Sequence, residues 1–439
     1  MRRILNRISA YFSRPEHVIL VILLIALFYL TIVPLFFIGA DTFTVHAAEV
    51  RRIRGSSVGD FTFYHWDYVF NSTASSNLFY KPLLNTIFVS IFSCAFALVV
   101  GGFFAWMVTR TNLRFRKPIA TMMLFPYIMP SWTLAMAWLN FFKNKSIGGA
   151  PGIFTAITGI ETADWFAYGF FPIVMVLGMH YAPFAFILIG GILRNMDANL
   201  EEAAVILKTS RARIIWKITV PIVMPAVLST FLLVFSSSMS AFAVPAFLGG
   251  PVRYQVLTTQ LYRTINGVNP GAGYIIASFM IIVGILILTV NQIIIGKRKG
   301  FTTVTGKSSN ISLVNLRKLR TPLSVIMLCM LLAVAVIPLL TFAAQSFYLE
   351  PGNYKFSNLS SIFWVGEGRP DIASGEPGIL KNKYVYQGIF NSFSLSLVVA
   401  LVAGTVGILV GYSVAKTRGR FGSNMVDRLA FFQIGRAHV

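Results

Sequence analysis

The chain has 439 residues, a mean hydropathy of +0.72 and only 12% charged residues, which together exclude a soluble multidomain protein. Its net charge of +22 would suit a nucleic-acid-binding protein, but the basic residues stand at the ends of apolar segments without interleaved aromatic residues, which excludes that class. No metal site, disulfide or cofactor is predicted, because Cys94 and Cys329 lie singly inside apolar segments.

Eight apolar segments are each long enough to cross a bilayer as a helix, which needs about 20 residues. None of them contains Lys, Arg, Asp or Glu. Basic residues concentrate in alternate connections, so the positive-inside rule predicts a cytoplasmic N-terminus. The predicted fold class is an all-α integral membrane protein, a polytopic helix bundle. The predicted spans are 17–39, 85–109, 119–142, 169–193, 222–248, 273–296, 322–345 and 389–415.

An internal repeat relates the second and eighth spans. Aligned without gaps, Asn85 falls on Asn391 and Arg114 on Arg420, with Ser, Ala, Gly, Thr and Phe matches between and beyond them. An even number of spans separates the two copies, so both have the same orientation, and the repeat is a parallel one. In both copies small residues at every fourth position allow a neighbouring helix to approach closely. These residues are Ala97, Gly101 and Ala105 in the first copy, and Ala403, Gly407 and Gly411 in the second.

The repeat divides the chain into modules. A first module of about six helices is predicted over residues 1–300, a basic linker over 301–321, and the truncated start of a second module, with two spans, over 322–433. The last six residues, 434–439, abandon the pattern and coincide with one reading frame of a common sequencing adaptor. They are predicted to be non-native, with the natural chain continuing past residue 433.

The stretch from Glu201 to Pro225 interrupts the apolar pattern with two carboxylates, two alanines and several cations. It resembles the EAA loop of the membrane subunits of ATP-binding-cassette importers, whose pattern is E-A-A-x3-G-x9-I-x-L-P. Val220 stands where the family has Leu, and Lys208 stands where it has Gly, a residue that tolerates positive φ freely. The matching residues are Glu202, Ala203, Ala204, Ile218 and Pro221.

This resemblance implies a coupling loop over residues 196–221, in which a short helix docks in a groove of a separate ATPase subunit. Glu202 would pair there with a basic residue, while Ala203 and Ala204 allow close approach. Pro221 is expected to open the next membrane helix, where a missing N–H costs little. An amphipathic helix that faces lipid headgroups is the alternative.

A second stretch, from Ser236 to Asn266, is similar to the exit of the fifth span in permeases for ferric iron and in related ones for thiamine or phosphonates. Hydroxyl groups there could line a translocation pathway, or they could hydrogen-bond between helices. Pro245 and the following Gly249-Gly250 are expected to break the helix where backbone faces a cavity. The hydroxyl-bearing residues are Ser236, Ser237 and Ser238.

Two further patterns were weighed. The run from Gly300 to Ser308 has the wrong spacing for a phosphate-binding loop and follows no strand, so ATP hydrolysis is expected in another chain. His180 could act in a proton relay, but with no carboxylate beside it we expect a packed, hydrogen-bonded residue.

These features predict a permease without enzymatic activity, in the cytoplasmic membrane of a bacterium. Its expected partners are ATPase subunits, an extracytoplasmic substrate-binding protein and lipid. Ferric iron is the predicted substrate, and thiamine, a phosphonate or another small solute remain open. An ion-driven secondary transporter would need charged residues within the membrane, and a receptor would not need a duplicated bundle.

Overall fold

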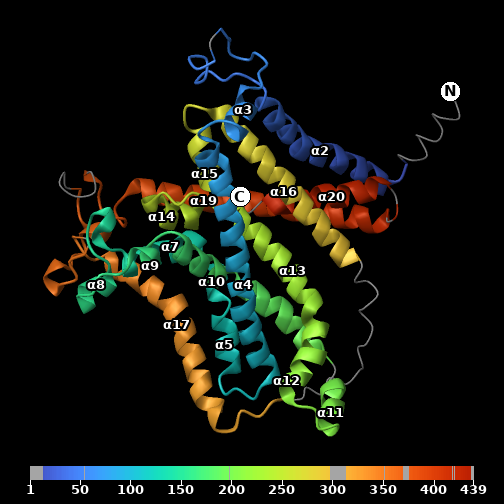
Figure 1. The fold of residues 1–439 in the computed structure, drawn as a ribbon, viewed down its shortest axis with the longest axis vertical. Helices are drawn as coiled ribbons and strands as arrows, with labels where there is room; N and C mark the ends of the chain where they lie inside the picture. The colour runs from blue at the N-terminus through green and yellow to red at the C-terminus, as the bar shows by residue number, and fades with distance from the viewer. Residues whose placement is uncertain are drawn as a thin grey trace. The chain divides into compact units, whose positions relative to one another are not determined.

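The computed structural model describes residues 13–53, 55–196, 198–296, 313–350, 352–368, 375–417, 419 and 421–436. These residues form helices joined by loops, with only isolated β-bridges among them (Figure 1). The linker residues 301–312 and the tail residues 437–439 lie outside the described ranges. Seven helical segments are long and apolar enough to cross a membrane, which confirms the predicted fold class: Pro15–Asp41, Ser76–Arg110, Asp164–Asn195, Ala212–Met239, Pro270–Ile287, Arg317–Gln345 and Lys383–Lys416.

The third predicted span, 119–142, is wrong as a continuous helix. It is divided into α5 (Arg116–Met122), α6 (Phe125–Ile128) and α7 (Ser131–Phe142), with a bend of 94° between residues 116–128 and 131–142. The cause is local. Met129 precedes Pro130 and adopts an extended ψ of 138°, because the proline ring disfavours helical backbone in the residue before it.

The chain folds into two compact units that do not follow the order of the sequence. Unit 1 comprises Met1–His65, Asn269–Ser278 and Ser360–Val439, and unit 2 comprises Trp66–Val268 and Phe279–Leu359. The module boundaries predicted from the repeat therefore stay a prediction from the sequence.

Unit 2 is built around α4 (Lys81–Arg110) and α10 (Phe170–Asn195), which pack along most of their length, with α13 (Val220–Met239) against both. The predicted small-residue face of α4 lies in this contact, and Ala97, Gly101 and Ala105 are buried. A methyl group on Gly101 would collide with the carbonyl of Ala182, and it would come within 2.6 Å of Ala185 Cβ. Only glycine allows the two helix backbones to approach this closely.

The first helix of the predicted second module also belongs to unit 2. This helix, α17 (Arg320–Gln345), packs against α5 and α7. Its Met327 and Leu331 are buried in one cluster with Ile119 of α5 and with Met123, which directly follows α5. The remaining helices of unit 2 are α8 (Ile153–Thr158), α9 (Asp164–Ala167), α11 (Ala198–Ile206), α12 (Arg211–Ile214), α14 (Ala243–Gly249) and α15 (Leu257–Ile265).

Unit 1 contains α2 (Pro15–Asp41), α18 (Ile362–Val365), α19 (Lys383–Lys416) and α20 (Phe421–Arg436). Leu20 and Leu27 of α2 form a buried cluster with Val426 and Leu429 of α20. The small-residue face predicted on α19 is exposed, and a methyl group on Gly407 would meet nothing within 4 Å among the described residues. Two helices cross from one unit into the other along the chain, α3 (Tyr64–Phe70) and α16 (Pro270–Gly296).

Candidate functional site

The loop between the fourth and fifth predicted spans has the helix–turn–helix form expected from its sequence. Helix α11 is followed by a turn at residues 207–210 and then by α12. A π-helical turn, η3 (Ile215–Thr219), joins α12 directly to α13, and the N–H of Val220 bonds to the carbonyl of Ile215. The prediction that Pro221 opens the membrane helix is wrong, because Pro221 lies within one continuous helical segment, Ala212–Met239. The π-helical turn directly before Pro221 accommodates its missing N–H.

The turn after α11 keeps the geometry that glycine would provide. Lys208 has a φ of +55°, in the left-handed region. The N–H of Thr209 bonds to the carbonyl of Ala204 at 3.0 Å, and the N–H of Lys208 bonds to that of Val205 at 2.9 Å. These two bonds make a Schellman C-cap, in which the left-handed residue is usually glycine. The substitution of lysine at this position therefore leaves the turn intact at some conformational cost.

Replacing Lys208 with glycine is expected to stabilise this turn by up to about 1 kcal/mol, because glycine reaches positive φ without strain. Lys208→Val is expected to destabilise it by at least as much, since a β-branched residue is poorly tolerated there. Limited proteolysis within residues 203–213 measures both changes, with Lys208→Asn as the control that should resemble the wild type. Equal cleavage rates in the glycine and valine variants would contradict this account.

Large apolar side chains are exposed along this loop. Val205, Ile206 and Leu207 at the end of α11 and Trp216 in η3 all face solvent, and Ile206 is 78% exposed. Of the residues predicted from the family pattern, Ala203 and Pro221 are exposed, while Ala204 and Ile218 are half-buried. The side chain of Glu202 lies outside the described part of the structure. The loop thus presents an apolar surface, which we call the α11 surface, formed by Val205, Ile206, Leu207 and Trp216.

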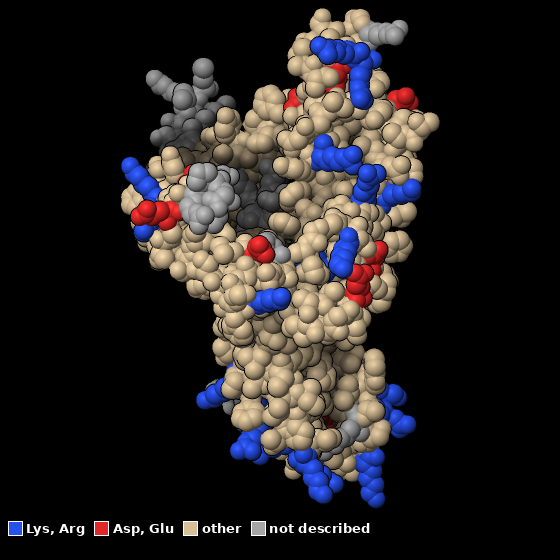
Figure 2. All heavy atoms as spheres, turned by 90° about the vertical axis from the view of Figure 1, so that its left-hand side faces the viewer, with Lys and Arg blue, Asp and Glu red and all other residues tan. Residues whose placement is uncertain are grey.

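Basic side chains surround this end of unit 2. Figure 2 shows Lys and Arg gathered at the end that holds α11, α12 and the start of α17, and above them a band without charged side chains on this face. The cations of these segments include Arg114, Arg116, Lys117, Lys208, Arg213, Lys217, Arg317 and Lys318. A band without charge next to a basic rim is the pattern of a membrane-spanning unit with its ends in water.

An ion pair behind the loop was not predicted from the sequence. Arg110, the last residue of α4, is buried, and its Nη2 lies 3.7 Å from Oε1 of Glu201 on α11. The same carboxylate oxygen accepts a hydrogen bond of 2.9 Å from the hydroxyl of Thr219. The signal that could have found this pair is the cation at the same point of both repeat copies, Arg110 in the first and Lys416 in the second.

The predicted pathway serines lie at the end of α13. Ser238 is buried, and its hydroxyl has no hydrogen-bond partner among the described residues. The carbonyl of Ser237 accepts a bond from the Tyr181 hydroxyl at 3.3 Å, and the carbonyl of Ser236 accepts one from Ser240 at 3.0 Å. Four further buried hydroxyls of α4 and α13 also have no hydrogen-bond partner among the described residues: Ser90, Ser93, Ser229 and Thr230.

The helix break predicted at Pro245 occurs earlier in the chain. Helix α13 ends at Met239, residues 240–242 form the break, and Pro245 is buried within the first turns of α14. A proline near the start of a helix lacks only an N–H that would have no partner there, so it does not interrupt α14. Gly249 ends α14, and the chain continues in a 3-10 turn from Gly250.

His180 is packed and hydrogen-bonded, as predicted. It is buried in α10, and its Nδ1 lies 2.8 Å from the carbonyl oxygen of Pro126. Since a carbonyl only accepts, Nδ1 carries the proton. The Tyr127 and Tyr181 rings lie beside the imidazole at 5.6 and 4.9 Å between centroids.

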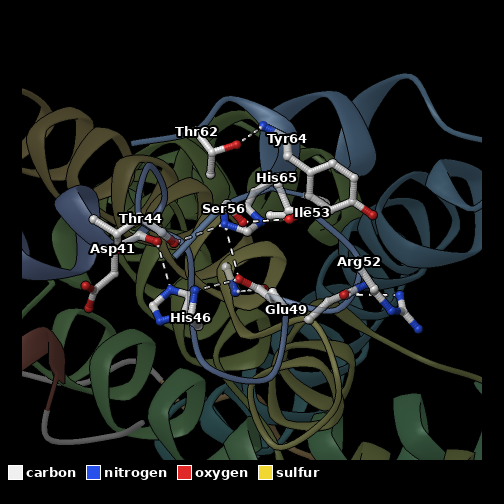
Figure 3. Close-up of polar contacts among 12 residues, drawn as sticks. Asp41, Thr44, His46, Glu49, Arg52, Ile53, Ser56, Thr62, Tyr64 and His65 are labelled. Carbon is white, nitrogen blue, oxygen red and sulfur yellow. Dashed lines mark hydrogen bonds and ion pairs between the residues drawn. The ribbon is translucent and has the colours of Figure 1, made fainter. Parts of the chain in front are cut away.

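A second polar cluster, in unit 1, orders the connection that follows α2 (Figure 3). Glu49 is fully buried and accepts bonds from the backbone N–H groups of His46, at 3.0 Å, and of Gly271, at 2.9 Å. Its Oε2 lies 3.3 Å from Nε2 of buried His65, which also lies 3.1 Å from the carbonyl of Thr44. Both neighbours of Nε2 are acceptors, so this nitrogen carries the proton. The carboxylate therefore fastens the connection to the start of α16.

Comparison with known proteins gives a match over the segment that holds the loop. Residues 97–300 match the family described as "binding-protein-dependent transport system inner membrane component". This range begins at Ala97, within α4, and holds all of α10 and α13 and the loop with the α11 surface.

Three relatives illustrate the similarity. The putative ferric transport system permease protein of Haemophilus influenzae is 27% identical over 230 residues, which are 52% of this chain and 35% of that protein. The ferric transport system permease protein of Actinobacillus pleuropneumoniae is 28% identical over 230 residues, with 52% and 33% covered. The spermidine/putrescine transport system permease protein of Escherichia coli is 29% identical over 222 residues, with 50% and 75% covered. This chain thus spans only about a third of the length of the two ferric relatives. Over this segment, which includes the exposed loop between two spans, the chain is similar to the inner membrane components of binding-protein-dependent transport systems.

Proposed function

We propose that this chain is the translocation subunit of an ATP-driven importer and that the α11 surface docks on a separate ATPase subunit. The observation that carries the proposal is the exposure of Val205, Ile206, Leu207 and Trp216 on a loop between two membrane spans. Several large exposed apolar side chains on one loop, with basic residues around them, mark an interaction site. The match of this loop to the EAA pattern supports an ATPase as the partner. On this proposal the loop lies in the cytoplasm, as the positive-inside rule also predicts for the N-terminus.

The mechanism requires no covalent chemistry from this chain. A substrate-loaded binding protein docks on the outer loops, and ATP-driven closure of the partner subunits moves two permease halves through alternating access. The internal repeat supplies the two halves. The coupling residues of this loop are Glu202, Ala203, Ala204, Lys208, Ile218 and Pro221, with Glu202 pairing with a basic group of the ATPase.

Ferric iron is the substrate that the relatives favour, because two of them are described as ferric transport permeases. A spermidine/putrescine permease shares the same segment, so the module type also serves other solutes. The unpartnered buried hydroxyls of α4 and α13, with Ser238 at their end, are proposed to line the pathway. Hydroxyls without a carboxylate suit a passage that should not hold a cation tightly. Ser236, Ser237 and Pro245 adjoin this segment.

Docking is tested by placing a charge on the α11 surface. Ile206→Glu is expected to weaken binding of the importer's ATPase subunit to the chain in nanodiscs at least about tenfold, because it places a carboxylate in an apolar contact. The matched control is Ile157→Glu, since Ile157 is equally exposed, at 77%, but lies on α8, outside the loop. No binding by the wild type, or equal binding by both variants, would overturn the proposal.

Coupling is tested at Glu202 in proteoliposomes that hold the complete importer. Glu202→Lys should leave ATP hydrolysis running while transport falls at least about tenfold, since reversing one charge of a desolvated pair is costly. Transport at the wild-type rate would remove Glu202 from the coupling role.

A further inference from the structure

The cation at the end of α4 is enclosed by protein. Arg110 is only 1% exposed, although it stands at the end of a membrane span, where an arginine could extend its guanidinium into water. Arginine is almost never fully buried unless it is paired. Because Arg110 is buried, its charge has a function that the solvated basic residues around the loop do not have.

The partner of Arg110 is the coupling loop itself. Glu201, 17% exposed, lies in the first turn of α11 with Oε1 3.7 Å from Arg110 Nη2, and Thr219 bonds to the same oxygen at 2.9 Å. One carboxylate thus joins α4, α11 and the turn that leads into α13.

The backbone around Arg110 extends this connection to α17. The carbonyl of Arg110 accepts a bond of 2.8 Å from the N–H of Val314, and Asn112 bonds through its side chain to the N–H of Leu316 at 2.9 Å. The N–H of Arg114 bonds to the hydroxyl of Ser324, on α17, at 3.0 Å. Residues 110–114 are therefore bonded to α17, the first helix of the second repeat copy, and to the residues that lead into it. Through the Arg110 side chain they also contact the coupling loop.

The ion pair is incompletely formed in this conformation. The Nε, Nη1 and Nη2 atoms of Arg110 make no hydrogen bond to any described residue. A charge-assisted N–H···O bond has a length of about 2.7–2.9 Å, so a movement of α11 by about 1 Å would turn the 3.7 Å contact into a direct bond. Unpaired donors on a buried charge are costly, so a shorter contact would be favoured, and small shifts at such a site are amplified by packed helices.

We infer that Arg110 is the positioning residue of this loop: the Arg110–Glu201 pair tightens when α11 is displaced and passes that displacement to α4, α13 and α17. The inference rests on the proposed function for the source of the displacement. The pair itself is a property of this chain and can be tested without a partner.

The first test measures hydrogen–deuterium exchange of the amides of residues 203–219 in the full chain in nanodiscs. Glu201→Gln and Arg110→Gln should each speed exchange there about tenfold, because each leaves a buried polar group unpaired, while exchange in α10 stays unchanged. The double variant should exceed neither single one, and Arg110→Lys, which keeps the charge, should recover part of the protection. The control is Glu161→Gln, which breaks an exposed pair with Lys145 that has nearly the same separation, 3.6 Å.

Unchanged loop exchange in the single variants, or a double variant whose effect is the product of the two, would overturn the inference. If Arg110→Gln fails to fold, Glu201→Gln and Thr219→Val carry the test, since Thr219→Val removes the other bond to the same carboxylate.

The second test uses the assembled importer. Glu201→Gln should bind the ATPase subunit normally, since the α11 surface is intact, but should lower the number of substrate molecules transported per ATP about tenfold. A merely structural role would lower hydrolysis and transport together, and that result would overturn the inference. Failure of the wild-type chain to bind an ATPase would instead overturn the proposed function and would leave the exchange result standing.

Discussion

Replacing Gly101 with alanine is expected to destabilise the protein by about 3 kcal/mol, at the upper end of the usual cost of overpacking a core. The added methyl group would collide with backbone atoms, the carbonyl of Ala182 and the amide nitrogen of Phe186, rather than with a side chain that could rotate away. Relief requires α4 and α10 to separate. Since α10 leads into the loop that contains α11 and α12, and α4 carries Arg110, the same separation should disturb that loop.

The measurement is the unfolding temperature of the purified chain in detergent. The matched control is Gly102→Ala, where the new methyl group would have its nearest contact at 3.5 Å, to the side chain of Ile189. That substitution should be neutral or slightly stabilising, because alanine is the better helix former by up to about 1 kcal/mol. Equal unfolding temperatures for the two variants would contradict the close approach of the helices.

Replacing Glu49 with glutamine is expected to cost about 3 kcal/mol in unit 1, although the two side chains have the same shape. The carboxylate of Glu49 faces only donors: the backbone N–H groups of His46 and Gly271 and the protonated Nε2 of His65. An amide group would turn its own N–H groups toward at least one of them. A buried donor facing a donor loses its hydrogen bond and gains repulsion.

Proteolytic cleavage of the connection over residues 43–65, together with thermal unfolding, should detect this loss. Asp60→Asn is the control, because Asp60 accepts a bond of 2.6 Å from the N–H of Ser57 on an exposed part of the same connection. If Glu49→Gln is cleaved no faster than Asp60→Asn, the buried carboxylate does not order this segment.

The loop between α10 and α13 shows which features of local structure can be predicted from the sequence. The alternation of short helix, turn and short helix follows from the residues themselves. The left-handed position at Lys208 is what the resemblance implies, because the family pattern has glycine there. The burial of Arg110 could not be predicted in this way. As a member of a basic run after an apolar span it has the composition of a solvated rim, and its partner Glu201 comes from a distant part of the chain.

The membrane class, seven of the spans to within several residues at most ends, and the position of the loop can be predicted from the sequence, since each depends on hydropathy or spacing along the chain. Which helices meet cannot be predicted in this way, because it depends on tertiary packing. Gly101 lies against the backbone of a neighbouring helix, whereas a methyl group on Gly407 would meet nothing within 4 Å among the described residues. The neighbouring helix, and not the glycine itself, makes this difference. The same holds for α17, which packs on α5 and α7, and for α2, which packs on α19 and α20. An apolar helix carries the same pattern whatever apolar surface it contacts, so its partner is set by shape and by a few buried polar bonds.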